Sequence, residues 1–499
     1  MTMFKINGMR GFLASSIASS IGVACAAALA LPSTLPATAA TARPAPGVAR
    51  SAPAAGRPDV PGSTQSLPLT PLAPLAPRTR AIGATGSEAF AEQGLTRHHV
   101  QRFSMVGVIW NNPDTELHGH VQVRTRATGT GTWTGWRSLE THNDDAADPG
   151  TAERTSGRVR GSTAPLWVGD SDGVEVRVRA EGARRTEDAP STRAVPAASR
   201  LPSGLRLELV NPGDPDDGGD EAPMRGAPPV APHGSQAGLP GSGTGGAESA
   251  EDLAASTANA DLAPLGATVI PALSRSATER EMRTLRGREL TESQRKKPHI
   301  GPRPRIVTRR GWGADEHLRE KGFVYAKKVK VAFVHHTSSG NTYRCSEAAS
   351  VIRGIYRYHV QSMGWRDIGY NFLVDKCGNI YEGRAGGVAK PVKGAHTLGF
   401  NYNSMGIAVL GSFGKGKPPA AALKAIARLT AWKLGLYGVN PRGKAFLRSG
   451  GGNLYRKGEN VRLNVISGHR DGYPTACPGW QLYRKLGTAR STAARYQGR

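Results

Sequence analysis

A short apolar stretch that ends in two histidines decides the fold of the C-terminal part of the chain: Val329-Lys330-Val331-Ala332-Phe333-Val334-His335-His336-Thr337. Its length and its β-branched residues are typical of a buried strand. Neighbouring side chains on a strand point to opposite faces, so only one of the two histidines can face a given site, and the alternation does not say which one. Further candidates follow, namely strands at 370–374 and 405–410 and helices at 346–362 and 419–434. Together they predict an α/β domain over residues 300–490.

A second stretch carries a histidine and a cysteine that can complete a metal site: Gly468-His469-Arg470-Asp471-Gly472-Tyr473-Pro474-Thr475-Ala476-Cys477-Pro478-Gly479. Together with one histidine of the first stretch, His469 and Cys477 offer zinc two imidazoles and a thiolate. Three protein ligands leave a fourth position for water, as in catalytic zinc sites, whereas structural sites normally use four. Each segment alone is more often an ordinary packing feature. The two segments together favour a metal site.

The region from about Arg305 to Leu486 also carries short motifs in a fixed order: Arg310-Gly311-Trp312-Gly313-Ala314, Trp365-Arg366-Asp367-Ile368-Gly369-Tyr370-Asn371-Phe372, Ile380-Tyr381-Glu382-Gly383-Arg384, Gly394-Ala395-His396 and Asn403-Ser404-Met405-Gly406-Ile407. With these motifs the region resembles the peptidoglycan recognition protein family, also known as the type 2 N-acetylmuramoyl-L-alanine amidases. The resemblance covers about two fifths of the chain. It implies a mixed central β-sheet flanked by helices.

The resemblance also implies a zinc cofactor, held by His335, His469 and Cys477. Family members that only bind peptidoglycan have typically lost the cysteine, so Cys477 favours an active enzyme. Tyr370 matches the catalytic tyrosine of the family, although its motif alone is equally typical of a packing aromatic. Thr475 stands where a bacteriophage relative has lysine. We expect Thr475 to offer a second hydrogen-bond donor to the transition state, without an ammonium charge.

Two further motif residues are predicted to contact the substrate. Arg384 is able to pair with a carboxylate of the peptidoglycan stem peptide, or with Glu382 as a surface ion pair. His396 is predicted to line the groove, although a lone histidine is more often structural. The reaction implied is hydrolysis of the amide bond between the lactyl group of N-acetylmuramic acid and L-alanine. The alternative is a protein that binds peptidoglycan without cutting it.

The N-terminus predicts export. Lys5 and Arg10 precede a stretch rich in Ala, Ser and Leu that ends in the small-residue site Ala37-Thr38-Ala39. Residues 1–39 are therefore predicted to be a signal peptide that is removed. The chain is expected to be secreted or held in the cell wall, with no membrane span after cleavage, because no later segment is long and apolar enough.

The cysteine count agrees with an oxidising compartment. Of the four cysteines, Cys25 lies in the predicted signal peptide. If Cys477 binds zinc, Cys345 and Cys377 are left to form a disulfide. The alternative is a reduced cytosolic protein with three thiols.

The remainder of the chain divides by composition. Residues 40–97 are rich in Pro and Ala and are expected to be disordered, and residues 214–299 form a Gly/Pro-rich linker with a short helix candidate at 276–285. Between them, residues 98–213 alternate apolar and polar side chains at 121–126, 174–179 and 205–209. This period of two predicts a small all-β, sandwich-like domain of unassigned function. The domain contains Trp133, Trp136 and Trp167. These side chains are expected either to pack in its core or to stack on sugar rings.

The charge is concentrated in the C-terminal half. Residues 301–499 contain 34 Lys and Arg against 9 Asp and Glu, and the net charge of the whole chain is +26. A basic surface favours polyanions. For an exported chain, anionic cell-wall polymers are more suitable partners than nucleic acid. A protein that binds nucleic acid and in which zinc is structural is therefore the less favoured hypothesis. A solvated basic surface without a specific partner is the remaining alternative.

Overall fold

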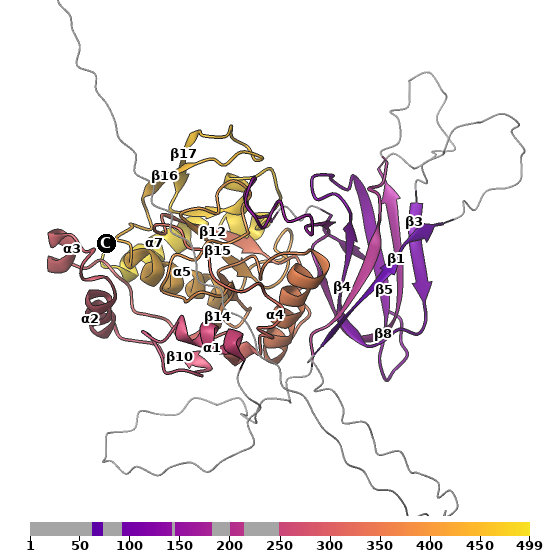
Figure 1. The fold of residues 1–499 in the computed structure, drawn as a ribbon, viewed down its shortest axis with the longest axis horizontal. Helices are drawn as coiled ribbons and strands as arrows, with labels where there is room; N and C mark the ends of the chain where they lie inside the picture. The colour runs from indigo at the N-terminus through magenta and orange to yellow at the C-terminus, as the bar shows by residue number, and fades with distance from the viewer. Residues whose placement is uncertain (1–61, 73–91, 142–144, 182–199, 214–248) are drawn as a thin grey trace, which may run out of the picture. The chain divides into compact units, whose positions relative to one another are not determined.

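The computed structural model describes residues 62–72, 92–141, 145–181, 200–213 and 249–499. The predicted signal peptide, 1–39, lies outside the described residues. Over these ranges no helix combines the length and the apolar character needed to cross a bilayer. The described elements form an N-terminal β domain, residues 62–213, and a C-terminal α/β domain, residues 249–499 (Figure 1).

The N-terminal domain is an antiparallel β structure, as predicted. Its strands run in the order β1-β9-β4-β8-β3-β2, with β5, β6 and β7 joined to this path. The 15-residue β8 pairs with β4 near its start and with β3 and β5 farther along. The strand bounds are β1 Ser63–Pro68, β2 Thr70–Pro71, β3 Glu92–Arg97, β4 Phe103–Trp110, β5 Gly119–Ala127, β6 Arg137–Leu139, β7 Gly161–Ser162, β8 Leu166–Ala180 and β9 Arg206–Asn211.

Alternation along these strands buries one face, as the sequence predicts. Val121 and Val123 are buried while the intervening Gln122 is not. Of the three tryptophans considered, Trp167 is buried in the core, whereas Trp136 is 37% exposed. The guanidinium of Arg177 lies over the Trp136 ring, 4.3 Å from its centroid. This contact gives Trp136 a protein partner at the surface.

The expectation that residues 40–97 are disordered is wrong for 63–71 and 92–97. β1 pairs with β9 along its whole length, and β3 pairs with β8. The folded sheet supplies backbone hydrogen bonds that composition does not reveal. Pro68 and Pro71 end β1 and β2, which lie at the two ends of the strand order, where a missing N–H donor is tolerated.

The C-terminal domain is built on a mixed sheet with helices on both faces, which confirms the predicted fold class. The strand order is β10-β11-β14-β13-β15-β12-β18, in which β12 is parallel to both of its neighbours. A separate hairpin pairs β16 with β17. The strand bounds are β10 Val269–Ile270, β11 Ile306–Val307, β12 Val331–His336, β13 Phe372–Val374, β14 Ile380–Glu382, β15 Ser404–Val409, β16 Lys444–Arg448, β17 Asn460–Asn464 and β18 Ile466–Gly468.

Side chains on the two sheet faces enter two different cores. Ile407 and Val409 of β15 pack with α5 and α7, whereas Ala408 packs with residues of α4. The predicted helix at 346–362 is observed as a 3-10 turn at Cys345–Glu347, α4, and a π-helical turn at Tyr358–Ser362. The helices of this domain are α1 Ala250–Thr257, α2 Arg275–Arg286, α3 Glu292–Lys296, α4 Ala348–Arg357, α5 Ala420–Gly435, α6 Trp480–Tyr483 and α7 Leu486–Tyr496.

The expectation of a linker over residues 214–299 is wrong for 249–299. This part contains α1, β10, α2 and α3, of which α2 matches the predicted short helix. Ile270, Met282 and Leu290 join the core beside α5, and β10 pairs with β11. These few apolar residues anchor a segment whose overall composition is that of a linker.

A disulfide joins Cys345 and Cys377, whose Cα atoms are 6.3 Å apart. It ties the turn before α4 to the turn that follows β13. Closing a loop of this size contributes about 3–4 kcal/mol in the loop-entropy account.

Candidate active site

Strand register brings two of the predicted metal ligands together. β12 and β18 are parallel neighbours in which Val334 pairs with Gly468. His335 follows Val334 in β12, and His469 follows the last residue of β18 and begins a 3-10 turn; their ring centroids lie 4.5 Å apart. Both lie at the carboxyl ends of the strands, where open α/β sheets commonly place their sites.

His336 points to the opposite face of β12 and does not join the cluster. Its Nδ1 accepts a hydrogen bond from the Phe413 N–H at 3.2 Å, and its Nε2 lies 2.9 Å from the Ser338 hydroxyl. Burial lowers the pKa of His336 to about 4. Its ring therefore acts as a neutral structural group.

Cys477 completes a group of three possible ligands. Its Sγ lies 3.7 Å from His335 Nδ1, and the ligand atoms of His335, His469 and Cys477 all lie within 4.8 Å of one another. Burial lowers the pKa of His469 to about 3, so this imidazole is neutral. Within the described part of the chain, both ring nitrogens of His469 are buried without a hydrogen-bond partner. Two imidazoles and a thiolate with an unsatisfied buried nitrogen fit a zinc ion.

Residues around His335 support its orientation. The hydroxyl of Thr397 faces His335 Nε2 at 3.5 Å, which leaves Nδ1 directed at the cluster. Contacts of this kind set the tautomer of a metal-binding histidine. His396, predicted to contact substrate, is fully buried with its ring 5.2 Å from that of His335. The structure therefore places His396 in the interior next to His335, and burial lowers its pKa well below the ordinary value.

Tyr370 lies beside the same cluster. Its ring centroid is 5.5 Å from that of His335. Burial, reinforced by the Asp145 carboxylate, raises the pKa of Tyr370 well above the ordinary value, so the phenol stays protonated. Thr475 accepts a hydrogen bond from the Cys477 N–H at 3.1 Å, which leaves its own hydroxyl hydrogen available for donation.

Asp145, from the N-terminal domain, is a site residue that the sequence did not reveal. Its Oδ1 lies 3.0 Å from His335 Nδ1 and 3.4 Å from His469 Nδ1, and its Oδ2 accepts a 2.5 Å hydrogen bond from Tyr370. Burial would raise the pKa of Asp145, but the two imidazoles and the Tyr370 hydroxyl together hold it below the usual range. The only sequence signal is a short acidic segment around 145–153, which does not name its partners.

Arg384, predicted to bind a substrate carboxylate, pairs with Glu153 of the N-terminal domain. Two hydrogen bonds of 2.9 and 2.8 Å join the guanidinium to this carboxylate. Nε of Arg384 also donates to the Ile368 carbonyl at 2.9 Å. Glu382, the alternative partner, accepts hydrogen bonds from Asn259 and from the Arg309 N–H instead. Burial raises the pKa of Glu382 to about 7.

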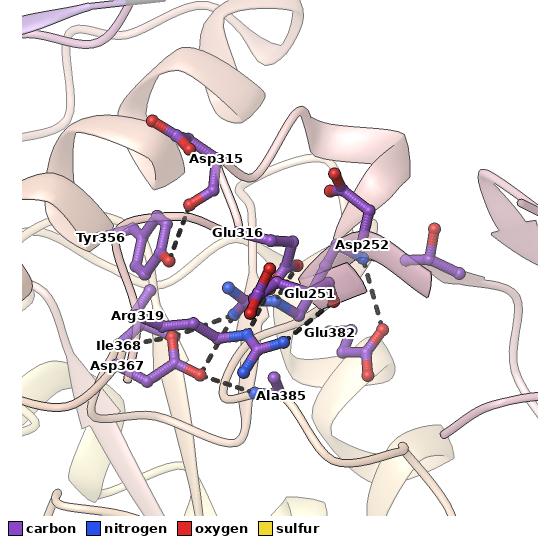
Figure 2. A network of polar contacts seen from close by, with 12 residues as sticks. Glu251, Asp252, Asp315, Glu316, Arg319, Tyr356, Asp367, Ile368, Glu382 and Ala385 are labelled. Atoms are coloured by element: carbon purple, nitrogen blue, oxygen red, sulfur yellow. Dashed lines mark hydrogen bonds and ion pairs between the residues drawn. The ribbon is translucent and has the colours of Figure 1, made fainter. Parts of the chain in front are cut away.

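A buried ion-pair network around Glu316, Arg319 and Asp367 (Figure 2) contacts residues that lie next to Tyr370 and Arg384 in the sequence. Asp367 accepts hydrogen bonds from the N–H groups of Ile368 and Ala385, at 2.7 and 2.8 Å. Arg309 pairs with both Asp367 and Glu316, and Arg319 pairs with Glu316 as well. Asp367 thus links the segment before Tyr370 to the segment that follows Arg384.

Comparison with known proteins identifies two regions. Residues 51–198 match a domain described as Rv3811 N-terminal galactose-binding domain-like. Residues 325–480 match the family described as N-acetylmuramoyl-L-alanine amidase.

Individual relatives match the C-terminal domain. Peptidoglycan-recognition protein SC2 of Drosophila simulans is 30% identical over 185 residues, which are 37% of this chain and 85% of that protein. Peptidoglycan-recognition protein 2 of Holotrichia diomphalia is 31% identical over 38% of this chain and 86% of its own length. A solved structure of peptidoglycan recognition protein-LE in complex with tracheal cytotoxin is 32% identical, covering 37% of this chain and 92% of that one, with a TM-score of 0.28.

Proposed function

Because the chain belongs to the peptidoglycan recognition protein family, we propose that it is a secreted, zinc-dependent N-acetylmuramoyl-L-alanine amidase. It hydrolyses the amide bond between the lactyl group of N-acetylmuramic acid and L-alanine of bacterial peptidoglycan. The observation that carries this proposal is the group of His335, His469 and Cys477 with Tyr370 beside it. A family member without the cysteine would lack the third ligand.

Each site residue has a distinct role in this proposal. Zinc, when bound, supplies a Lewis acid for the attacking water and for the scissile carbonyl. Tyr370, kept as a neutral phenol, donates a hydrogen bond to the oxyanion that develops in the transition state. Thr475 offers a second hydroxyl donor near Cys477. Arg384 pairs with a carboxylate of the stem peptide, which takes the place of the Glu153 carboxylate.

The surroundings of the site support catalysis as well as binding. His335 and His469 are 0% and 1% exposed, so hydrogen bonds in the site act in a region of low dielectric constant. The basic excess of the C-terminal half supports attraction to anionic cell-wall polymers. This attraction should weaken as salt is raised.

The test combines zinc analysis with products identified by mass spectrometry. Purified protein is incubated with defined muropeptides, and release of free stem peptide with an N-terminal L-alanine is the expected result. Cys477→Ala should lose zinc and hydrolysis together, while circular dichroism shows that the fold persists. Zinc-loaded protein that binds peptidoglycan and releases no peptide would instead support the alternative, a non-catalytic recognition protein.

A further inference from the structure

Residues 145–153 of the N-terminal domain enter the site of the C-terminal domain. This segment lies between β6 and β7, and it carries three carboxylates that contact the other domain. Asp145, Asp148 and Glu153 are only 7%, 8% and 8% exposed. Burying a carboxylate is costly unless it is paired, so these three contacts are specific features of the fold.

Asp145 reaches both catalytic elements of the proposed enzyme. Bonds of about 2.0–2.3 Å at tetrahedral angles hold neighbouring zinc ligands roughly 3.3–3.6 Å apart. Asp145 Oδ1 lies 3.4 Å from His469 Nδ1, which is within this range, and 3.0 Å from His335 Nδ1, which is shorter. This oxygen is buried, and it faces the imidazole nitrogens of His335 and His469. The other carboxylate oxygen holds the Tyr370 hydroxyl.

Asp148 and Glu153 fix the rest of the segment. Asp148 Oδ1 accepts hydrogen bonds from the backbone N–H and the side-chain amide of Asn401, at 3.1 and 2.7 Å. Its Oδ2 lies 3.1 Å from Lys393 Nζ. Glu153 takes both guanidinium donors of Arg384. The acidic segment is thus bound by an amide, an ammonium and a guanidinium group, which are groups that can also bind the carboxylates of a peptide.

We propose that residues 145–153 are an inhibitory segment, in which Asp145 is a fourth zinc ligand and Glu153 stands in for a substrate carboxylate on Arg384. The inference rests on the proposed amidase function. A site with four protein ligands is closed, whereas the reaction needs a position for water. Asp145 also accepts the hydrogen bond of the Tyr370 hydroxyl. The same residue therefore occupies the position that water needs and engages the donor that the oxyanion needs.

A cavity of about 750 Å³ borders the segment and provides access to its edge. It is lined by residues of both domains, including Asp145, Pro149, Arg154 and Tyr473. A stem peptide or a glycan that enters this cavity would contact the edge of segment 145–153. Displacement of the segment would then open the metal position.

The test compares the full chain with single variants, using cobalt in place of zinc as a spectroscopic probe. Asp145→Ala removes the proposed ligand, and Asp145→Asn is a second variant of nearly the same shape, in case the first fails to fold. Glu153→Gln weakens the contact with Arg384 without touching the metal cluster. Asp170→Asn is the matched control, because it removes the same charge from an exposed position of the same domain.

Three measurements are made on each protein: the visible spectrum with Co²⁺, the zinc dissociation constant by chelator competition, and the rate of peptidoglycan hydrolysis at saturating zinc. We expect both Asp145 variants to change the Co²⁺ spectrum and to weaken zinc binding about 10- to 100-fold, the range found when support of a metal site is lost. Hydrolysis should rise about tenfold or more. Glu153→Gln should lower KM with a wild-type Co²⁺ spectrum, and the control should match wild type throughout.

The outcomes separate this inference from the proposed function. An unchanged Co²⁺ spectrum and zinc affinity in both Asp145 variants would refute the ligand assignment. Loss of hydrolysis in zinc-loaded Asp145→Ala would show that Asp145 serves the reaction, and the inhibitory role would be wrong. A changed spectrum with no hydrolysis by any protein, wild type included, would uphold the fourth ligand and overturn the amidase.

Discussion

His335 and His336 are adjacent in the chain, yet they face opposite sides of β12. His335 Nδ1 lies 3.7 Å from Cys477 Sγ, whereas His336 bonds to Phe413 and Ser338. The pair therefore provides a matched test of the metal site within one strand. Both side chains are buried, so a difference between them reports their direction and not their exposure.

His335→Ala should lose bound zinc and all hydrolysis, because the site loses one of the two imidazoles in the group of His335, His469 and Cys477. His336→Ala should keep zinc near one equivalent per chain and lose stability only. The measurement is metal content by mass spectrometry after dialysis, with unfolding followed in parallel. Zinc loss in His336→Ala with full occupancy in His335→Ala would reverse the assignment.

Tyr370→Phe removes one hydroxyl and little volume. Loss of a transition-state donor usually costs about 10²–10³ in rate, whereas ground-state affinity changes little. We therefore expect kcat to fall by this range with KM nearly unchanged. Steady-state kinetics on a defined muropeptide measures both, and a raised KM with an unchanged kcat would make Tyr370 a substrate contact.

Non-reducing peptide mapping of the metal-loaded protein should recover Cys345 linked to Cys377. Cys477 should become alkylatable only after chelation and unfolding, because a zinc-bound thiolate is protected. Recovery of Cys477 in a disulfide would remove the third ligand from the proposed site.

Glu382 predicts a pH-dependent stability. Burial raises its pKa in the folded protein to about 7, above the ordinary value of 4.5. The folded state therefore binds this proton more tightly than the unfolded state does, and stability is lost as pH rises from about 4.5 to about 7. The side chain of Glu382→Gln does not titrate, so the variant does not lose this part of its stability. The free energy of unfolding of Glu382→Gln minus that of wild type should therefore increase between pH 4.5 and 8, by at most about 3 kcal/mol.

Urea unfolding of both proteins at the two pH values gives this difference. Comparison with wild type cancels the titration of other groups. A difference that is the same at both pH values would show that the Glu382 carboxyl titrates normally. Glu251→Gln is a suitable control, because its carboxyl pairs with the exposed Lys321 ammonium rather than with buried groups.

Much of the C-terminal fold follows from local sequence. The apolar run before His335 specifies a buried strand, and the helix at 420–435 follows from its pattern and from the proline before it. The strands at 63–68 and 92–97 escaped prediction because their stability comes from pairing with β9 and β8. Such pairing overrides a composition rich in Pro and Ala.

The candidate site divides in the same way. The sequence by itself determined the residue types suited to zinc, the family motifs that single out His335, and the cysteines available for a disulfide. Only the tertiary structure decided that Asp145 and Glu153 lie against Tyr370 and Arg384, 225 and 231 residues away. Periodicity reports which face of a strand is buried, but it carries no information on which distant side chain meets that face. Contacts between domains depend on the packing of complete surfaces, so they appear only when the chain has folded.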